Sequence, residues 1–134
     1  TLESTSAMGH AVTMNRPLRL NKIEDEPGFI EYISNGTPAD NIKMGKHLLL
    51  DKMPDLVVSG INHGSNAAIN IIYSGTMAAA LEAAMDGIPA IGFSLAEYGQ
   101  HPDFSHVSEF VLKITKRVLN DGLPTGIALN VNIP

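Results

Sequence analysis

The sequence contains no cysteine and no tryptophan, and aromatic residues make up only 5% of its 134 positions. Without cysteine, disulfide scaffolds, structural zinc fingers, iron–sulfur sites and cysteine nucleophiles are all excluded, whereas a reducing compartment is permitted. Hydrophobic residues still reach 44% against 17% charged residues, which is too apolar for a disordered segment. A chain of this length can bury the core of one domain. We therefore expect a single domain over residues 1–134.

Long apolar runs are also missing. Gly, Asn or charged residues interrupt every apolar stretch well before the roughly 20 residues that span a bilayer. The first residues lack the basic and apolar regions of a signal peptide, so we expect a cytoplasmic location and no membrane partner. The net charge of −5 and the pI near 5.4 argue against nucleic acid polymers as partners, because such proteins carry a basic surface.

Basic residues are absent from one long stretch of the chain. Between Lys52 and Lys113 there is no Lys or Arg. An anion bound by that stretch would need another source of positive potential. The two obvious sources are the backbone amides at a helix N-terminus and a bound divalent cation.

The order of the sequence patterns predicts an α/β fold. Residues 1–36 predict short strands at 12–14, 18–20 and 29–33, separated by turns at Arg16-Pro17 and Glu26-Pro27-Gly28 and together forming a β-hairpin region. From residue 37 onward helices and apolar strands alternate, as in a parallel sheet. The expected elements are a helix at 38–50, a strand at 55–59, a helix at 74–86, a strand at 89–94, a helix at 107–118 and a strand at 127–133.

Two of these elements carry a burial prediction. The strand at 55–59 is short and rich in β-branched residues up to Gly60, so we expect it to be buried on both faces. The helix at 74–86 is rich in alanine, with Glu82 the single charged residue of its body. A helix without a polar face should be covered on nearly every side.

The loop after the strand at 55–59 is the first candidate site, because doubly wound sheets bind ligands beyond the carboxyl ends of their strands. Gly60 and Gly64 allow close backbone approach, and Asn62 and Asn66 supply neutral oxygen and nitrogen groups. Such groups suit a hard cation or a hydroxylated ligand. Spacing alone is equally consistent with an ordinary turn.

The start of the alanine-rich helix is the second candidate site. Ser74, Gly75 and Thr76 place two hydroxyl groups and a glycine where a helix N-terminus could receive an oxyanion. An ordinary serine N-cap is the more common explanation of such a segment taken alone.

Several motifs, in this order along the chain, resemble those of the SurE family, the stationary-phase survival proteins. The resemblance implies metal-dependent 5′/3′-nucleotidase activity on nucleoside monophosphates and a Rossmann-like three-layer fold with helices on both faces of the sheet. It covers nearly the whole chain and is carried by SAMGHAVT at 6–13, GTPAD at 36–40, VSGINHGSN at 58–66, YSGT at 73–76, ALEAA at 80–84 and LNVNIP at 129–134.

The resemblance assigns roles to individual positions. Ser6 and Asn62 match the family's neutral metal ligands, so we expect their side chains to lie close together, with Mg²⁺ or Mn²⁺ as the cofactor. The turn of Ser74, Gly75 and Thr76 matches the phosphate-holding turn. The loop residues expected to contact substrate are Gly60, Gly64 and Asn66. A homodimer or homotetramer is also implied.

One part of the family pattern is missing. Family members begin with a strand that ends in Asp-Asp-Gly, whose carboxylates complete the metal site, and this sequence contains no Asp-Asp pair. It also ends before the family's C-terminal extension. We therefore expect a fragment of a longer protein, and the catalytic residues stay unassigned. The alternative is a non-catalytic phosphate- or nucleotide-binding module that lacks the acidic half of the metal site.

Overall fold

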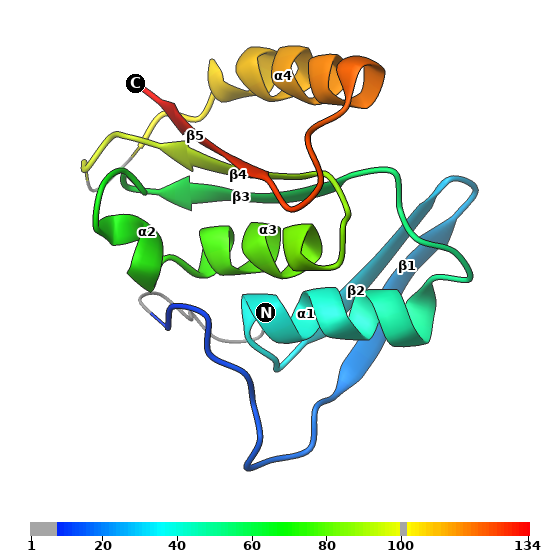
Figure 1. Ribbon diagram of the computed structural model, residues 1–134. Helices are drawn as coiled ribbons and strands as arrows, with labels where there is room; N and C mark the ends of the chain where they lie inside the picture. Colours follow the sequence, from blue (N-terminus) through cyan, green and yellow to red (C-terminus); the bar gives the residue numbers. More distant parts are fainter. Residues whose placement is uncertain (1–7, 100–101) are drawn as a thin grey trace.

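The computed structural model describes residues 8–99 and 102–134, and its centre is a parallel sheet (Figure 1). The sheet consists of β3 (Val57–His63), β4 (Ala90–Leu95) and β5 (Ala128–Ile133) in the order β3-β4-β5. Helix α3 (Gly75–Met85) lies on one face and α4 (Val107–Asp121) on the other. The predicted three-layer α/β arrangement is confirmed.

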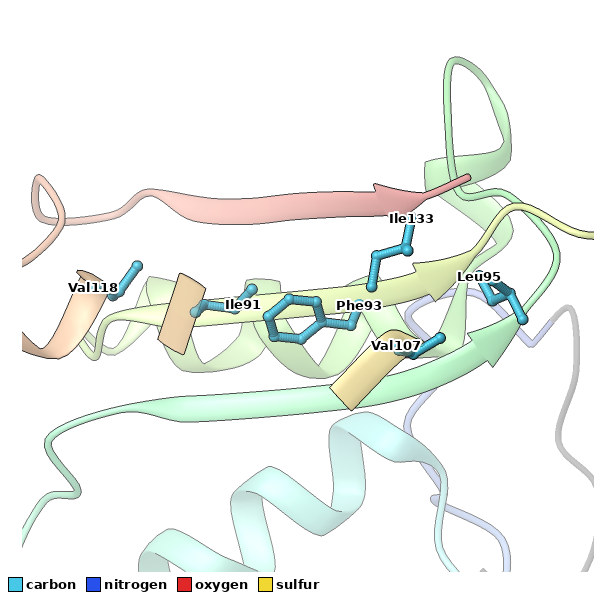
Figure 2. Packing of buried hydrophobic residues seen from close by; sticks show 6 residues of the cluster. All are labelled: Ile91, Phe93, Leu95, Val107, Val118 and Ile133. Atoms are coloured by element: carbon cyan, nitrogen blue, oxygen red, sulfur yellow. The ribbon is translucent and has the colours of Figure 1, made fainter. Parts of the chain in front are cut away.

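The face of the sheet under α4 holds one of two hydrophobic clusters. Alternate residues of the central strand β4 point toward α4, and Figure 2 shows them meeting side chains from α4 and from the end of β5. The helix is amphipathic as predicted, although Phe110, at an expected core position, is 43% exposed. The members of the cluster are Ile91, Phe93, Leu95, Val107, Val118 and Ile133.

The opposite face packs against α3 through small side chains. Met77, Ala80 and Ala83 of the helix form one buried cluster with Ala90 of β4, and α1 covers the outer side of α3 (Figure 1). The prediction of a nearly enclosed helix is confirmed for most of α3. Its exceptions are Leu81, which is 37% exposed, and Met85, which is 68% exposed at the last turn.

Helix α1 (Pro38–Met44) begins with a capping box and continues as the π-helical segment η1 (Gly45–Leu49), which confirms the helix predicted over residues 38–50. The amide of Asp40 donates to Thr37 Oγ1 (3.1 Å), and the amide of Thr37 donates to Asp40 Oδ2 (2.9 Å). Burial alone would raise the pKa of Asp40, but hydrogen bonds from Thr13 and Thr37 outweigh it and hold that pKa below its ordinary value.

The N-terminal region forms one hairpin, composed of β1 (Leu20–Glu26) and antiparallel β2 (Phe29–Ser34). The turn predicted around Pro27 and Gly28 is confirmed, and of the strand predicted at 18–20 only Leu20 lies in β1. The strand predicted at 12–14 is wrong. The backbone there is bound by the start of α1 instead. Thr37 Oγ1 donates to the carbonyl of Ala11 (2.7 Å), and the amide of Thr13 donates to Asp40.

Strand β3 differs from its prediction in length and in burial. It does not end at Gly60 but continues to His63, with a register shift against β4 between Ser59 and Asn62. Gly60 has φ +115°, and a Cβ there would lie 2.4 Å from the carbonyl oxygen of Phe93, so only glycine fits. Within the described ranges β3 pairs with β4 alone. No described strand pairs with its other edge, and Val58 is 46% exposed, so the strand is not buried on both faces.

Helix α4, at 15 residues, is the longest helix described. Across residues 8–99 and 102–134, no helix is both long enough and apolar enough to cross a membrane.

Candidate functional site

Both candidate segments lie at one end of the sheet, which we call the ligand-binding edge and which is distinct from the lateral side of β3 that no described strand pairs with. The carboxyl ends of β3, β4 and β5 meet there, and α3 begins at the same edge because it runs antiparallel to the strands (Figure 1). The loop after β3 leads through the short helix α2 (Asn70–Tyr73) into α3. The topology thus brings residues 60–66 and 74–76 to the ligand-binding edge of a doubly wound sheet.

Asn62, the predicted metal ligand, lies at the end of β3 opposite Ser94 of β4. Its Nδ2 donates to the carbonyl of Gly64 (2.8 Å) and to Oδ1 of Asn66 (3.3 Å). No residue in the described ranges donates to its Oδ1, so that oxygen is the atom left for a ligand.

The other predicted metal ligand, Ser6, lies outside the described residues. Its closeness to Asn62 therefore stays a prediction. Among residues 8–99 and 102–134, no group of three or more His, Asp or Glu side chains could hold a metal ion. Because hard divalent cations favour several oxygen ligands, including carboxylates, the Asn62 oxygen alone does not fit a Mg²⁺ or Mn²⁺ site.

Asn66 is 4% exposed, and its backbone amide, its carbonyl and its side chain all form hydrogen bonds. Its backbone amide donates to Oδ1 of Asn132 (2.8 Å), and its carbonyl accepts from Nδ2 of Asn130 (2.9 Å). Its side-chain Nδ2 donates to the hydroxyl of Ser94. Through these bonds Asn66 connects the loop to β4 and β5. Its contact with substrate, and those of Gly60 and Gly64, stay predictions.

The start of α3 carries unpaired backbone donors. Ser74 is the N-cap, and its Oγ accepts from the amide of Met77 (3.1 Å). The amides of Gly75 and Thr76 have no acceptor among the described residues, as is usual in a first helical turn. A Cβ at Gly75 would lie 2.9 Å from Cγ of Pro38. The glycine therefore also lets α1 and α3 approach each other.

The segment after residue 7 is bound beside this helix start. The amide of Gly9 donates to the carbonyl of Tyr73 (3.0 Å), and His10 Nε2 pairs with Glu82 (2.7 Å). Lys43 of α1 pairs with the same carboxylate, which is only 6% exposed. Burial alone would raise the pKa of Glu82, but hydrogen bonds from Lys43 and His10 outweigh it and hold the pKa below its ordinary value.

Sequence reasoning missed several polar residues of this edge. Asn130 and Asn132 stand two apart in β5, and period-2 spacing places both on one face of a strand. That spacing is a signal that could have found them. Nothing in the sequence pointed to Tyr98, whose hydroxyl accepts from the amide of Ser65 (3.3 Å), or to Ser94.

The chain resembles known proteins over nearly its whole length. The 5′-nucleotidase SurE of Cytophaga hutchinsonii is 56% identical over 130 residues, which cover 96% of this chain and 50% of that protein. The 5′-nucleotidase SurE of Chlorobium chlorochromatii is 49% identical over 132 residues, covering 98% and 48%. The chain thus spans about half the length of the curated relatives it matches.

A solved structure and a family profile agree with these relatives. The crystal structure of the SurE protein from Aquifex aeolicus superimposes with a TM-score of 0.84 at 42% identity, covering 96% of this chain and 51% of that one. The profile of the family described as Survival protein SurE matches residues 2–134. The chain therefore belongs to the SurE family.

Proposed function

We propose that the protein containing this chain is a metal-dependent 5′-nucleotidase that hydrolyses nucleoside monophosphates, with activity extending to 3′-monophosphates. Family membership supports the proposal, and the similar proteins from Cytophaga hutchinsonii and Chlorobium chlorochromatii are named 5′-nucleotidases. One observation carries it. The amides at the start of α3, which have no acceptor among the residues that the structure describes, lie at the same end of the sheet as the Asn62 loop, in a stretch without Lys or Arg.

The start of α3 has hydrogen-bond donors that could bind the phosphate group of a nucleotide. The amides of Gly75 and Thr76 and the two hydroxyl groups of Ser74 and Thr76 are donors, and a hydroxyl that accepts one bond can still donate another. The positive end of the helix dipole adds to the attraction. Donors fixed in advance stabilise negative charge as it develops in the transition state, so this turn would bind the phosphoryl oxygens throughout the reaction.

The proposed cofactor is Mg²⁺ or Mn²⁺. Because the described residues contain no cluster of His, Asp or Glu side chains that could hold a metal ion, metal dependence rests on the family resemblance. It is tested on the whole protein: EDTA should abolish phosphate release, and added Mn²⁺ or Mg²⁺ should restore it. Full activity in EDTA would contradict metal dependence and leave the nucleotidase proposal standing.

The catalytic roles are tested by substitution in the full-length protein, with phosphate release from nucleoside monophosphates as the measurement. Asn62→Ala should lower kcat strongly. Thr76→Val should cost less than the roughly 2.7–4 kcal/mol measured for loss of a strong oxyanion donor, because the backbone amides remain. Thr125→Val makes the same change on an exposed loop and should leave kcat and KM unchanged. Wild-type kinetics in Asn62→Ala would contradict its assignment.

The alternative function is non-catalytic binding of phosphate or a nucleotide. It is favoured by the lack of a carboxylate cluster within the described ranges. The same protein distinguishes the two functions. If calorimetry shows that a nucleoside monophosphate binds, and no phosphate is released at several metal concentrations, the binding module is the correct function and the nucleotidase proposal is wrong.

Two further proposals concern the whole protein. A homodimer or homotetramer is expected from the family resemblance, and light scattering coupled to gel filtration measures it. A cytoplasmic location is expected as well, and cell fractionation tests it. A monomer in solution would contradict the first expectation without affecting the proposed chemistry.

A further inference from the structure

Strand β5 has two faces with different uses. Leu129, Val131 and Ile133 pack into the cluster under α4. Asn130 and Asn132 alternate with them and therefore lie on the opposite face, toward the edge where the Asn62 loop ends. Two amides side by side on a strand are unusual, because Asn has low strand propensity. Packing of β5 against the sheet does not explain them.

These two amides hold one residue of the loop by both of its backbone groups. Oδ1 of Asn132 accepts from the amide of Asn66 (2.8 Å) and from the hydroxyl of Ser65 (3.1 Å). Nδ2 of Asn130 donates to the carbonyl of Asn66 (2.9 Å), and Nδ2 of Asn132 donates to Oδ1 of Asn130 (3.2 Å). Side chains of β5 thus form hydrogen bonds with the amide and carbonyl of Asn66, the groups that would pair with a neighbouring backbone if β3 continued as a strand.

The bonds continue from Asn66 to Asn62. Oδ1 of Asn66 accepts from Nδ2 of Asn62 (3.3 Å), while Nδ2 of Asn66 donates to Ser94. The nitrogen of the Asn62 amide is thereby committed, and its oxygen is left free of donors among the described residues. One hydrogen-bonded network thus joins six residues, which are Asn62, Ser65, Asn66, Ser94, Asn130 and Asn132. Linked hydrogen bonds polarise and so reinforce one another, and the bond between Asn66 and Ser94 is buried.

We propose that Asn132, assisted by Asn130, is a positioning residue that acts through Asn66 to fix the orientation of the Asn62 amide. Asn132 itself binds no ligand in this role. It removes the freedom of a loop containing two glycines and two asparagines, which would otherwise sample many conformations. The inference rests on the proposed function in one respect, namely that the Asn62 oxygen serves the hydrolysis.

The test uses the full-length protein and the substitution Asn132→Leu, which keeps the side-chain volume and removes the acceptor. Val131→Ala is the matched control, because it weakens the same strand on its other face. We expect kcat/KM of Asn132→Leu to fall about 10- to 100-fold, as for other small displacements of reacting groups. In Val131→Ala, kcat/KM should stay at the wild-type value although the melting temperature falls.

A double-mutant cycle separates positioning from general damage. If Asn132 acts through Asn62, then Asn132→Leu should have little further effect on kcat/KM in an Asn62→Ala background, because coupled residues are not additive. Full additivity of the two losses would overturn the proposal. If Asn132→Leu does not fold, Asn130→Leu replaces it, since Asn130 is exposed and its loss removes the bonds to the Asn66 carbonyl and from Nδ2 of Asn132 while leaving the bond from the Asn66 amide to Asn132 in place.

Hydrogen exchange gives a readout other than activity. The Asn66 amide should exchange faster in Asn132→Leu than in the wild type, and at the wild-type rate in Val131→Ala. Unchanged exchange in Asn132→Leu would overturn the proposal. An active wild type whose kcat/KM survives Asn132→Leu overturns the positioning role alone. A wild type that releases no phosphate overturns the proposed function and the positioning role together.

Discussion

Glu82 is a charged residue at 6% exposure in the middle of an alanine-rich helix. A buried carboxylate is costly unless it is paired. Here Lys43 of α1 and His10 of the N-terminal segment both bind it, so one side chain joins three parts of the chain. The two partners are only half-buried and can return to water if the carboxylate is lost. The energetic cost of its removal therefore stems mainly from the broken connections.

The effect of Glu82 on stability should depend on pH. Its pKa lies below the ordinary value of 4.5 in the folded protein, so the ionised form favours folding. This contribution is complete above about pH 4.5 and disappears as the pH falls through the folded-state pKa. Glu82→Gln should cost about 1–3 kcal/mol of unfolding free energy at pH 7, measured by urea unfolding.

The difference between Glu82→Gln and wild type should shrink as the pH falls from about 4.5 through the lower folded-state pKa, where the wild-type carboxylate also becomes neutral. Glu109→Gln on the exposed side of α4 is the control and should change little at any pH. A gap that stays constant from pH 7 to pH 3 would show that the Glu82 charge does not contribute to stability.

At the scale of elements, the contact between α1 and α3 depends on one missing side chain. Cβ at Gly75 would lie 2.9 Å from the ring of Pro38, a distance that forces one helix to move. Gly45, within the helical run that follows α1, has open space around the same position. The two glycines therefore have opposite roles, since one is needed for packing and the other only adds flexibility.

Substitution of these glycines by alanine should change stability in opposite directions. Gly75→Ala should lower the free energy of unfolding by about 1–3 kcal/mol because of overpacking. Gly45→Ala should raise it by up to about 1 kcal/mol because helical glycine is entropically unfavourable. Thermal unfolding of both variants measures the difference. A stabilising Gly75→Ala would mean that Pro38 moves aside without cost.

The sequence predicted best those elements whose pattern is set by local chemistry. Helix α1 has its cap and proline in the chain itself, and the apolar period of α4 identifies its buried side. Strand β3 was predicted less well, because its length and burial depend on which strands pair with it. Apolar β-branched residues predict a strand but do not distinguish a central position from an edge.

The candidate site shows the same limit. Motif resemblance pointed to Asn62 and to the Ser74 turn, but the bonds from Asn132 and Asn130 to Asn66 join residues 66 and 64 positions apart. No local pattern specifies such a pairing. The alternation of asparagines in β5 was visible in the sequence, yet only the fold shows what they bind.

At the scale of the whole molecule, the sheet formed by the described residues ends in a strand, β3, that is paired on one side only. Val58 and Ile61 of β3 are 46% and 38% exposed, and unpaired strand edges are templates for association with other chains. The 134-residue chain expressed alone should therefore self-associate or be unstable. Cooperative unfolding of a stable monomer comprising these residues alone would contradict this expectation.

A charge on the open edge should reduce self-association. Val58→Lys places a lysine on β3, and lysine is a residue that natural edge strands use against pairing. Light scattering of the 134-residue chain should fall relative to wild type at equal concentration. Val12→Lys adds the same charge at an exposed position outside the sheet and should have less effect. Equal reductions in both variants would mean that net charge, and not the edge, controls association.

Because the two faces of strand β5 have different contacts, the strand should not tolerate insertion or deletion of single residues. A residue inserted within β5 would turn Asn130 and Asn132 toward α4 and Val131 toward the loop, since a shift of one residue exchanges the two faces of a strand. A residue inserted in the turn before β5, near Gly126, leaves both faces in place, and exposed turns tolerate insertion. Length variation among functional homologues should therefore occur before residue 127 and be absent between residues 128 and 133.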